Sequence, residues 1–138
     1  MLSGPGPRGE YVITHPHQSD RLESLRSYGV LDSEAETEYD ALTALAAMIC
    51  DTPIALVTLV DANRQWFKSR HGVTVTQTSR RSSFAEYTVA AAVPLLVPDA
   101  ALDDRFARTI WSPDRWARAP TPGYRWRAVT GCRWAPSA

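Results

Sequence analysis

The chain has 138 residues, of which 44% are hydrophobic, so it can build one ordinary domain with a core. Its 15 basic and 15 acidic residues balance, and the net charge therefore indicates no polyanionic partner for the chain as a whole. Cys50 and Cys132 lack metal-ligand spacing and argue against a disulfide framework or a zinc site. Without a signal-like or transmembrane-length apolar run, we expect a cytoplasmic protein with no membrane partner.

The first segment, residues 1–18, is polar and interrupted by Gly and Pro, which predicts a disordered leader. His15 and His17 lie two residues apart within it, a spacing that a pair of metal ligands could use. No third ligand is close in the sequence, and a solvated linker is the preferred interpretation. We therefore predict no metal site.

Two helices are expected next. Ser19 or Asp20 can cap the first helix, and Gly29 is a natural residue for its end. Asp32 or Ser33 is expected to begin the second helix, because the acidic residues that follow are favourable near the positive end of a helix dipole.

The second predicted helix carries an apolar stripe with intervals of three, three, one and three residues. Its members are Tyr39, Leu42, Leu45, Ala46 and Ile49. This spacing places them on one helical face. We expect the stripe to pack against a sheet as part of the core. The alternative is a dimer seam, which would give a homodimer through the N-terminal helices.

A β-hairpin is predicted after this helix. Residues 54–60 form an apolar run rich in β-branched side chains, 61–63 have turn chemistry, and 65–70 resume as a second strand. Trp66 and Lys68 share a face of that second strand. The expected core consists of nine apolar residues: Leu42, Leu45, Ile49, Ile54, Leu56, Val57, Leu59, Trp66 and Phe84.

The cations of the second strand have two interpretations. Lys68 or Arg70 could attract an anionic ligand, or both could be exposed charges that discourage pairing of strand edges. Further along, Ser82 or Ser83 can cap a helix that carries Phe84.

Several ordered motifs resemble the start of a GAF domain. They are Gly29–Asp32, the strand Pro53–Asp61 and the run Arg64–Ser69, and the resemblance extends over about Arg21–Phe106. The similarity is to the bacterial subgroup that precedes histidine kinase, diguanylate cyclase and phosphatase modules.

The resemblance implies an α/β (α+β) fold of the GAF and PAS-like kind, with an antiparallel sheet flanked by helices and incomplete at its C-terminus. It also implies a sensory module that binds an unknown small molecule, holds no cofactor that the sequence identifies and has no enzymatic activity. Ala85 occupies the Cys position of relatives, which excludes thiol-based sensing there. The candidate ligand-binding residues are Trp66, Lys68, Tyr87, Asp99 and Arg105.

The last segment, residues 108–138, differs in composition from the partial GAF domain that we assign to 19–107. It holds six Arg, one Asp and four of the five Trp, without helical or strand periodicity. One alternative is a nucleic-acid-binding tail, since cations and aromatic rings can grip single strands. A shifted reading frame with GC-rich codons instead yields the motifs with which GAF relatives continue. Our interpretation is a frameshift near Ala107, which makes the chain a truncated fragment and a nucleic-acid partner the lesser alternative.

Overall fold

The computed structural model describes residues 2–5, 11–13, 17–81, 83–100, 102–107 and 128–130. The chain divides into two compact units, of which one is His17–Arg80 and the other combines Met1–Pro16 with Arg81–Ala138. Both contain helix and short antiparallel sheets, so the predicted α+β class is confirmed. Among the described residues, no helix is both long and apolar enough to cross a membrane.

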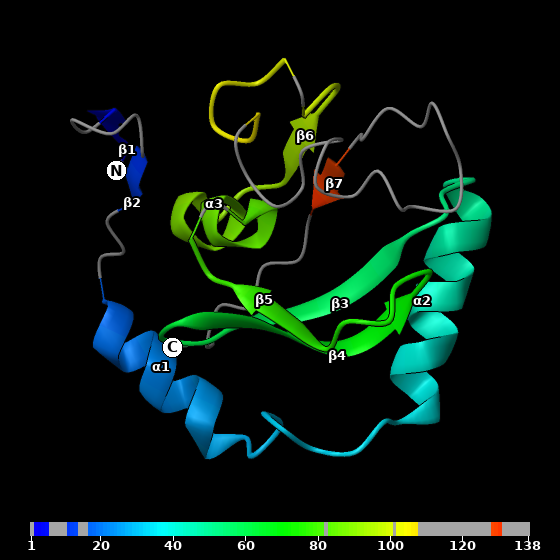
Figure 1. Cartoon of the computed structure of the whole chain (residues 1–138). Helices are drawn as coiled ribbons and strands as arrows, with labels where there is room; N and C mark the ends of the chain where they lie inside the picture. Colours follow the sequence, from blue (N-terminus) through cyan, green and yellow to red (C-terminus); the bar gives the residue numbers. More distant parts are fainter. Residues whose placement is uncertain are drawn as a thin grey trace. The chain divides into compact units, whose positions relative to one another are not determined.

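The unit His17–Arg80 contains two helices and a three-stranded antiparallel sheet of order β3-β4-β5. Its elements are α1 (Gln18–Ser27), α2 (Thr37–Ile49), β3 (Ala55–Val60), β4 (Arg64–His71) and β5 (Gln77–Ser79). Helix α2 packs along the β3–β4 hairpin (Figure 1). The central strand β4 is therefore covered by α2 and paired on both of its edges.

The predicted hairpin is confirmed, and its register contains a β-bulge. Val57 pairs with Ser69, but the next residue, Thr58, pairs with Phe67, which leaves Lys68 as an extra residue on β4. A bulge breaks the strict alternation of side chains between the two faces of a strand. The bulge allows two consecutive side chains of β4, those of Lys68 and Ser69, to be directed to the same side of the strand. The strand β3 is half-buried along 55–59.

The two helices begin at other residues than the sequence predicted. Helix α1 begins at Gln18, and Gly29 follows its end with a φ of 62°, as expected of a glycine there. Helix α2 begins at Thr37, four or five residues late, because Asp32 has a φ of 57° and Ser33 donates a hydrogen bond to the Val30 carbonyl. A left-handed residue cannot continue a right-handed helix.

Most of the apolar stripe of α2 faces away from the sheet, so its predicted burial was wrong except at Tyr39, which is half-buried with its ring 5.3 Å from Lys68 Nζ. Leu42, Leu45 and Ile49 are 57%, 47% and 71% exposed, whereas Thr43 and Ala47 are buried. A physical reason is visible at Thr43, whose hydroxyl hydrogen-bonds to β4 and thereby fixes which face of the helix is inward. Of the other residues predicted to form the core, Trp66 and Phe84 are buried. The remaining four are half-buried: Ile54, Leu56, Val57 and Leu59.

The other unit contains one described helix and two two-stranded antiparallel sheets, β1-β2 and β6-β7. Its elements are β1 (Leu2–Pro5), β2 (Tyr11–Ile13), α3 (Phe84–Ala91), β6 (Leu95–Val97) and β7 (Ala128–Thr130). The strands β1 and β2 lie in the segment predicted as a disordered leader, and β7 lies in the predicted tail. The division of the sequence into leader, partial GAF domain and tail stays a prediction.

Helix α3 begins directly after Ser83, which is one of the two caps predicted for it. The Oγ atom of Ser83 accepts a hydrogen bond of 3.1 Å from the backbone N–H of Glu86. Behind this cap, Phe84 and Tyr87 pack on Phe106, with ring centroids 4.4 and 5.0 Å away. These three buried rings form the centre of the small core of this unit.

Gly72, directly after β4, is a position that no side chain can occupy. It has a φ of 77°, and a Cβ atom there would lie 1.8 Å from the carbonyl oxygen of Pro53. Gly29 has a similar φ of 62° but open space around it.

We expect Gly72→Ala to lower the free energy of unfolding by about 3 kcal/mol or more, because the backbone must move. Gly29→Ala should cost only about 1–2 kcal/mol. Chemical denaturation of both variants measures this difference, and equal losses would contradict the close approach to Pro53.

Candidate functional site

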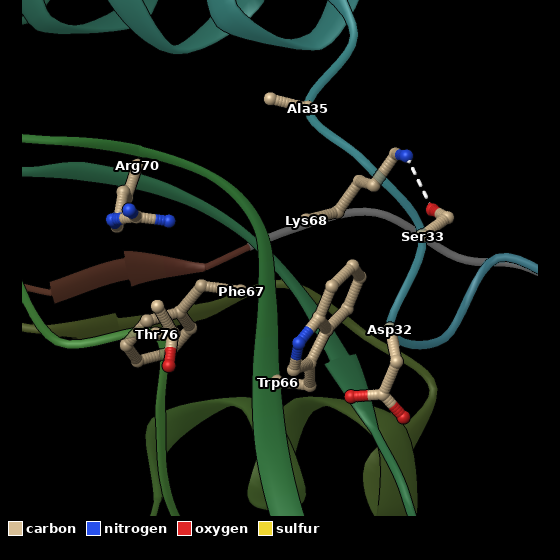
Figure 2. A pocket seen from close by; sticks show the side chains of 8 residues that line it. All are labelled: Asp32, Ser33, Ala35, Trp66, Phe67, Lys68, Arg70 and Thr76. Atoms are coloured by element: carbon tan, nitrogen blue, oxygen red, sulfur yellow. Dashed lines mark hydrogen bonds between the residues drawn. The ribbon is translucent and has the colours of Figure 1, made fainter.

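An open pocket of about 280 Å³ lies beside β4 in the unit His17–Arg80. Its lining comes from the segment before α2, from β4 and from the loop after β4: Asp32, Ser33, Ala35, Trp66, Phe67, Lys68, Arg70 and Thr76. In the view of Figure 2, Trp66, Lys68, Ser33 and Asp32 lie on one side of β4, and Phe67, Arg70 and Thr76 lie on the other. Two of them, Trp66 and Lys68, were predicted from the sequence as ligand-binding residues.

Lys68 is a buried ammonium group with a complete set of partners. Its side chain is 1% exposed, and it forms an ion pair with the carboxylate of Glu36. Its Nζ also donates to Ser33 Oγ at 2.6 Å (Figure 2) and to the carbonyl oxygen of Glu34 at 2.9 Å. The ring of Tyr39 lies 5.3 Å from the same nitrogen. An ammonium has three protons to donate, so Lys68 has none left for a ligand.

Ser69, the residue after Lys68, is also directed at α2. Its hydroxyl donates to Asp40 Oδ1 at 2.6 Å and lies 2.9 Å from the hydroxyl of Thr43. Together, Lys68 and Ser69 attach β4 to the extended segment before α2 and to the first turns of that helix. The bulge makes this double attachment possible, because it directs two consecutive side chains to the same side of the strand.

The remaining cation of the pocket is Arg70. It is exposed, and it makes no ion pair within the part of the chain that the structure describes. Trp66 is 8% exposed and forms an apolar wall of the same pocket. Arg70, as an exposed cation, fits both interpretations of these strand cations, whereas Lys68 fits neither because it is buried and paired.

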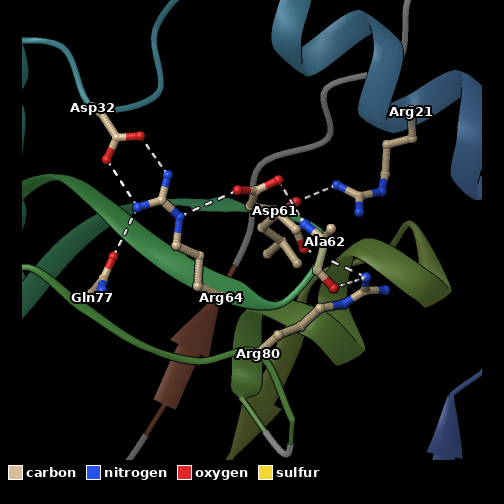
Figure 3. Close-up of polar contacts among 8 residues, drawn as sticks. Arg21, Asp32, Asp61, Ala62, Arg64, Gln77 and Arg80 are labelled. Atoms are coloured by element: carbon tan, nitrogen blue, oxygen red, sulfur yellow. Dashed lines mark hydrogen bonds and ion pairs between the residues drawn. The ribbon is translucent and has the colours of Figure 1, made fainter.

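A second polar cluster surrounds the turn between β3 and β4, and its centre is Arg64 (Figure 3). The guanidinium group bonds to both carboxylate oxygens of Asp32, to Asp61 Oδ2 at 3.2 Å and to Gln77 Oε1 at 2.9 Å. A bidentate pair of this kind fixes the orientation of both side chains. Arg64 thus joins the loop before α2, the hairpin turn and β5.

Two further arginines bond to backbone carbonyl groups at this turn (Figure 3). Arg21 of α1 donates to the carbonyl oxygen of Val60. Arg80 donates to the carbonyl oxygens of Ala62 at 3.0 Å and Asp61 at 3.4 Å. The three arginines Arg21, Arg64 and Arg80, which we call the arginine clamp, therefore hold the hairpin turn from three segments of the chain.

The clamp changes the acidity of its carboxyl groups. Hydrogen bonds from Arg64 lower the pKa of Asp32 below its ordinary value. Burial acts to raise the pKa of Asp61, but the Ala62 N–H and Arg64 outweigh it, and the pKa of Asp61 is lowered. Both carboxylates raise the pKa of Arg64 in turn. The cluster is therefore fully ionised at neutral pH.

The other three predicted ligand-binding residues lie in the other unit. The Arg105 guanidinium bonds to both carboxylate oxygens of Asp103, at 2.9 and 2.6 Å, and lies 5.5 Å from the ring centre of Tyr87. Hydrogen bonds from Arg105 lower the pKa of Asp103. Asp99 is half-buried, and its carbonyl oxygen accepts the N–H of Leu102.

The structure thus brings Trp66 and Lys68 to one pocket and Tyr87 and Arg105 into contact in the other unit. The assignment of all five residues to one ligand site stays a prediction. The arginine clamp was missed by sequence reasoning, although Asp61 and Arg64, three residues apart across a predicted turn, were a signal for it. Within the described ranges, no group of three or more His, Cys, Asp or Glu side chains is placed to hold a metal ion.

Comparison with known proteins gives a relative among bacterial proteins. No family model matches the chain. Over 98 residues, the chain is 36% identical to a cyclic di-GMP phosphodiesterase of Pseudomonas aeruginosa. The match covers 69% of this chain and 17% of that protein, so the chain spans about a sixth of the length of its relative. The chain is therefore homologous to part of a bacterial protein of this name.

Removal of the Lys68 ammonium tests its structural role. We expect Lys68→Ala to lower the free energy of unfolding by about 2–4 kcal/mol, because it leaves the polar partners of a buried cation unpaired. Arg70→Ala removes an exposed cation two residues away and should change that free energy by less than about 0.5 kcal/mol. Urea denaturation compares the two variants. If Arg70→Ala lowered the free energy of unfolding as much as Lys68→Ala, the structural role assigned to Lys68 alone would be contradicted.

The arginine clamp predicts acid sensitivity. A carboxyl group whose pKa is lowered by folding stabilises the protein above its unfolded pKa of about 3.9, and this contribution is lost as the pH falls through the folded value. The free energy of unfolding should therefore fall as the pH is lowered below about 4. Asp61→Asn should be less stable at pH 7 and lose less on acidification. Denaturation at pH 7 and pH 3 measures both effects, and an unchanged acid loss in Asp61→Asn would exclude Asp61 as a contributor.

Proposed function

We propose that this chain is a sensory, non-enzymatic module of a bacterial signal-transduction protein, of the GAF kind. The observation that carries the signalling role is the 36% identity over 98 residues to a cyclic di-GMP phosphodiesterase. The GAF assignment rests on the motifs Gly29–Asp32, Pro53–Asp61 and Arg64–Ser69, which in the structure form the loop before α2, the strand β3 with its flanks, and most of β4.

The ligand that we propose is a small planar anion bound in the β4 pocket. A volume of about 280 Å³ lies just below the range of about 300–1,000 Å³ for small-molecule sites. Arg70 supplies an exposed guanidinium, which can bond to a carboxylate or phosphate group in bidentate fashion. Trp66 supplies an apolar wall. A dinucleotide is too large for this space, so cyclic di-GMP is not the ligand that we propose for this pocket.

The proposed role of the pocket is recognition without chemical change. Most of the polar groups near it are engaged with one another: Lys68 with Ser33 and Glu36, and Asp32 with Arg64. Groups fixed in this way support the shape of a site but are not available as a base or a nucleophile. The cytoplasmic location expected from the sequence stays a prediction.

For the tail, we propose that residues 108–138 are the product of a frameshift and that the chain is a fragment of a longer module. The support is the change in composition after Ala107 and the family-like motifs in the shifted frame. The competing nucleic-acid function rests on the same tail, of which the structure describes 128–130. Sequencing of the gene with its downstream region tests the frameshift, and an uninterrupted frame identical to this one would refute it.

The ligand proposal is tested with benzoate, indole-3-carboxylate and cyclic AMP as probes of increasing size. We expect at least one probe to raise the melting temperature of the chain, because a ligand that binds only the folded state stabilises it. Arg70→Gln should weaken the binding of that probe about tenfold, since it removes a charged hydrogen-bond donor.

Arg81→Gln removes an exposed arginine outside the pocket and is the matched control. An equal loss of binding in both variants, or no thermal shift with any probe, would count against the β4 pocket as an anion site. The same samples are incubated with cyclic di-GMP and Mg²⁺ and analysed by chromatography. We expect no linear product, and a product that increases with protein concentration would overturn the non-enzymatic assignment.

A further inference from the structure

The outward face of α2 is almost entirely apolar. We define the outer face of α2 by its exposed residues between 41 and 49: Ala41, Leu42, Ala44, Leu45, Ala46, Met48 and Ile49. Met48 and Ile49 are 72% and 71% exposed, and Leu42 is 57% exposed. The one polar residue in this stretch, Thr43, is buried against β4. The usual pattern of a surface helix, apolar inside and polar outside, is therefore reversed.

This reversal cannot be relieved by rotation of the helix. The hydroxyls of Thr43 and Ser69 share a hydrogen bond, and the Ser69 hydroxyl donates its proton to the carboxylate of Asp40. Rotation that buried Leu42 and Leu45 would break both bonds and expose Ala47. Large contiguous apolar patches on soluble proteins usually mark interaction sites. The outer face of α2 therefore requires a partner element that packs on it.

The charges at the ends of this face restrict what the partner is. Glu38 lies at its N-terminal end and Asp51 just beyond its C-terminal end, and both are exposed. Helix α2 has no basic residue in its last turn, so the negative end of its dipole also lacks a compensating cation. A partner that fits both ends carries cations on either side of an apolar stripe.

A second copy of α2 does not meet this requirement. Packed in parallel, two copies would place Glu38 beside Glu38, and packed antiparallel they would place Glu38 beside Asp51. Like charges at an interface cost binding energy in either arrangement. The homodimer that the sequence left as an alternative is therefore the disfavoured occupant of this face.

We propose that the outer face of α2 is a docking surface for an amphipathic helix with an apolar stripe flanked by Lys or Arg residues. Helix-on-helix recognition of this kind uses apolar anchors one turn apart, which Leu42, Leu45 and Ile49 provide. The carboxylates of Glu38 and Asp51 then fix the register of the bound helix at both ends.

The test uses a fluorescein-labelled amphipathic peptide of Leu and Lys, and a second peptide in which every Lys is replaced by Glu. Fluorescence anisotropy with the full chain should show binding of the Leu/Lys peptide, weakened by added salt. The Leu/Glu peptide should bind at least about tenfold more weakly, because it places carboxylates against Glu38 and Asp51.

The variant Leu45→Lys should weaken binding of the Leu/Lys peptide about tenfold or more, because it places a charge at the centre of the docking surface. Leu102→Lys is the matched control, since Leu102 is a 77% exposed leucine outside α2, and it should leave binding unchanged. Circular dichroism verifies that both variants keep their helix content. Equal binding of the two peptides, or equal loss in the two variants, would overturn the proposal. Sedimentation analysis that shows a dimer abolished by Leu45→Lys would also overturn it, in favour of a second copy.

Discussion

A buried ammonium group must be paired with acceptors, and the unit His17–Arg80 is arranged around that requirement at Lys68. The acceptors come from the segment between the two helices: Ser33, the carbonyl of Glu34 and the carboxylate of Glu36. To present them, this segment stays extended and α2 begins only at Thr37. The buried ammonium of Lys68 thus helps to determine where the helix starts. It also helps to determine how the segment at the pocket lies and where β4 is held.

The arginine clamp applies the same physical principle to the hairpin turn. Carbonyl and carboxylate oxygens at the end of β3 need donors, and three guanidinium groups supply them. The three arginines come from α1, from β4 and from the residue after β5, and they link these segments by polar contacts. Apolar contacts contribute little here, since α1 has no buried residue. Hydrogen bonds and ion pairs therefore hold together segments of this unit that its small apolar core does not hold.

Local signals in the sequence were sufficient for some elements. The apolar run and turn chemistry predicted the β3–β4 hairpin, Gly29 predicted the end of α1, and Ser83 was one of two predicted caps of α3. The start and orientation of α2 depend on long-range bonds to Lys68 and Ser69, which periodicity does not encode. The same limit applies to the candidate site. The motif placed Trp66 and Lys68 at the pocket, but only the structure shows that Lys68 is internally paired and that Arg70 is the exposed cation.

The pocket and the outer face of α2 are physically connected through β4. Arg70 lies at the pocket, and Ser69, the residue before it, holds Thr43 on the inward side of α2. Lys68, the next residue back, lines the pocket and also holds the segment that leads into α2. A ligand that moved Arg70 and its strand would displace the hydrogen bonds that orient this helix. Three consecutive residues of β4 therefore join the lining of the pocket to the contacts that orient α2.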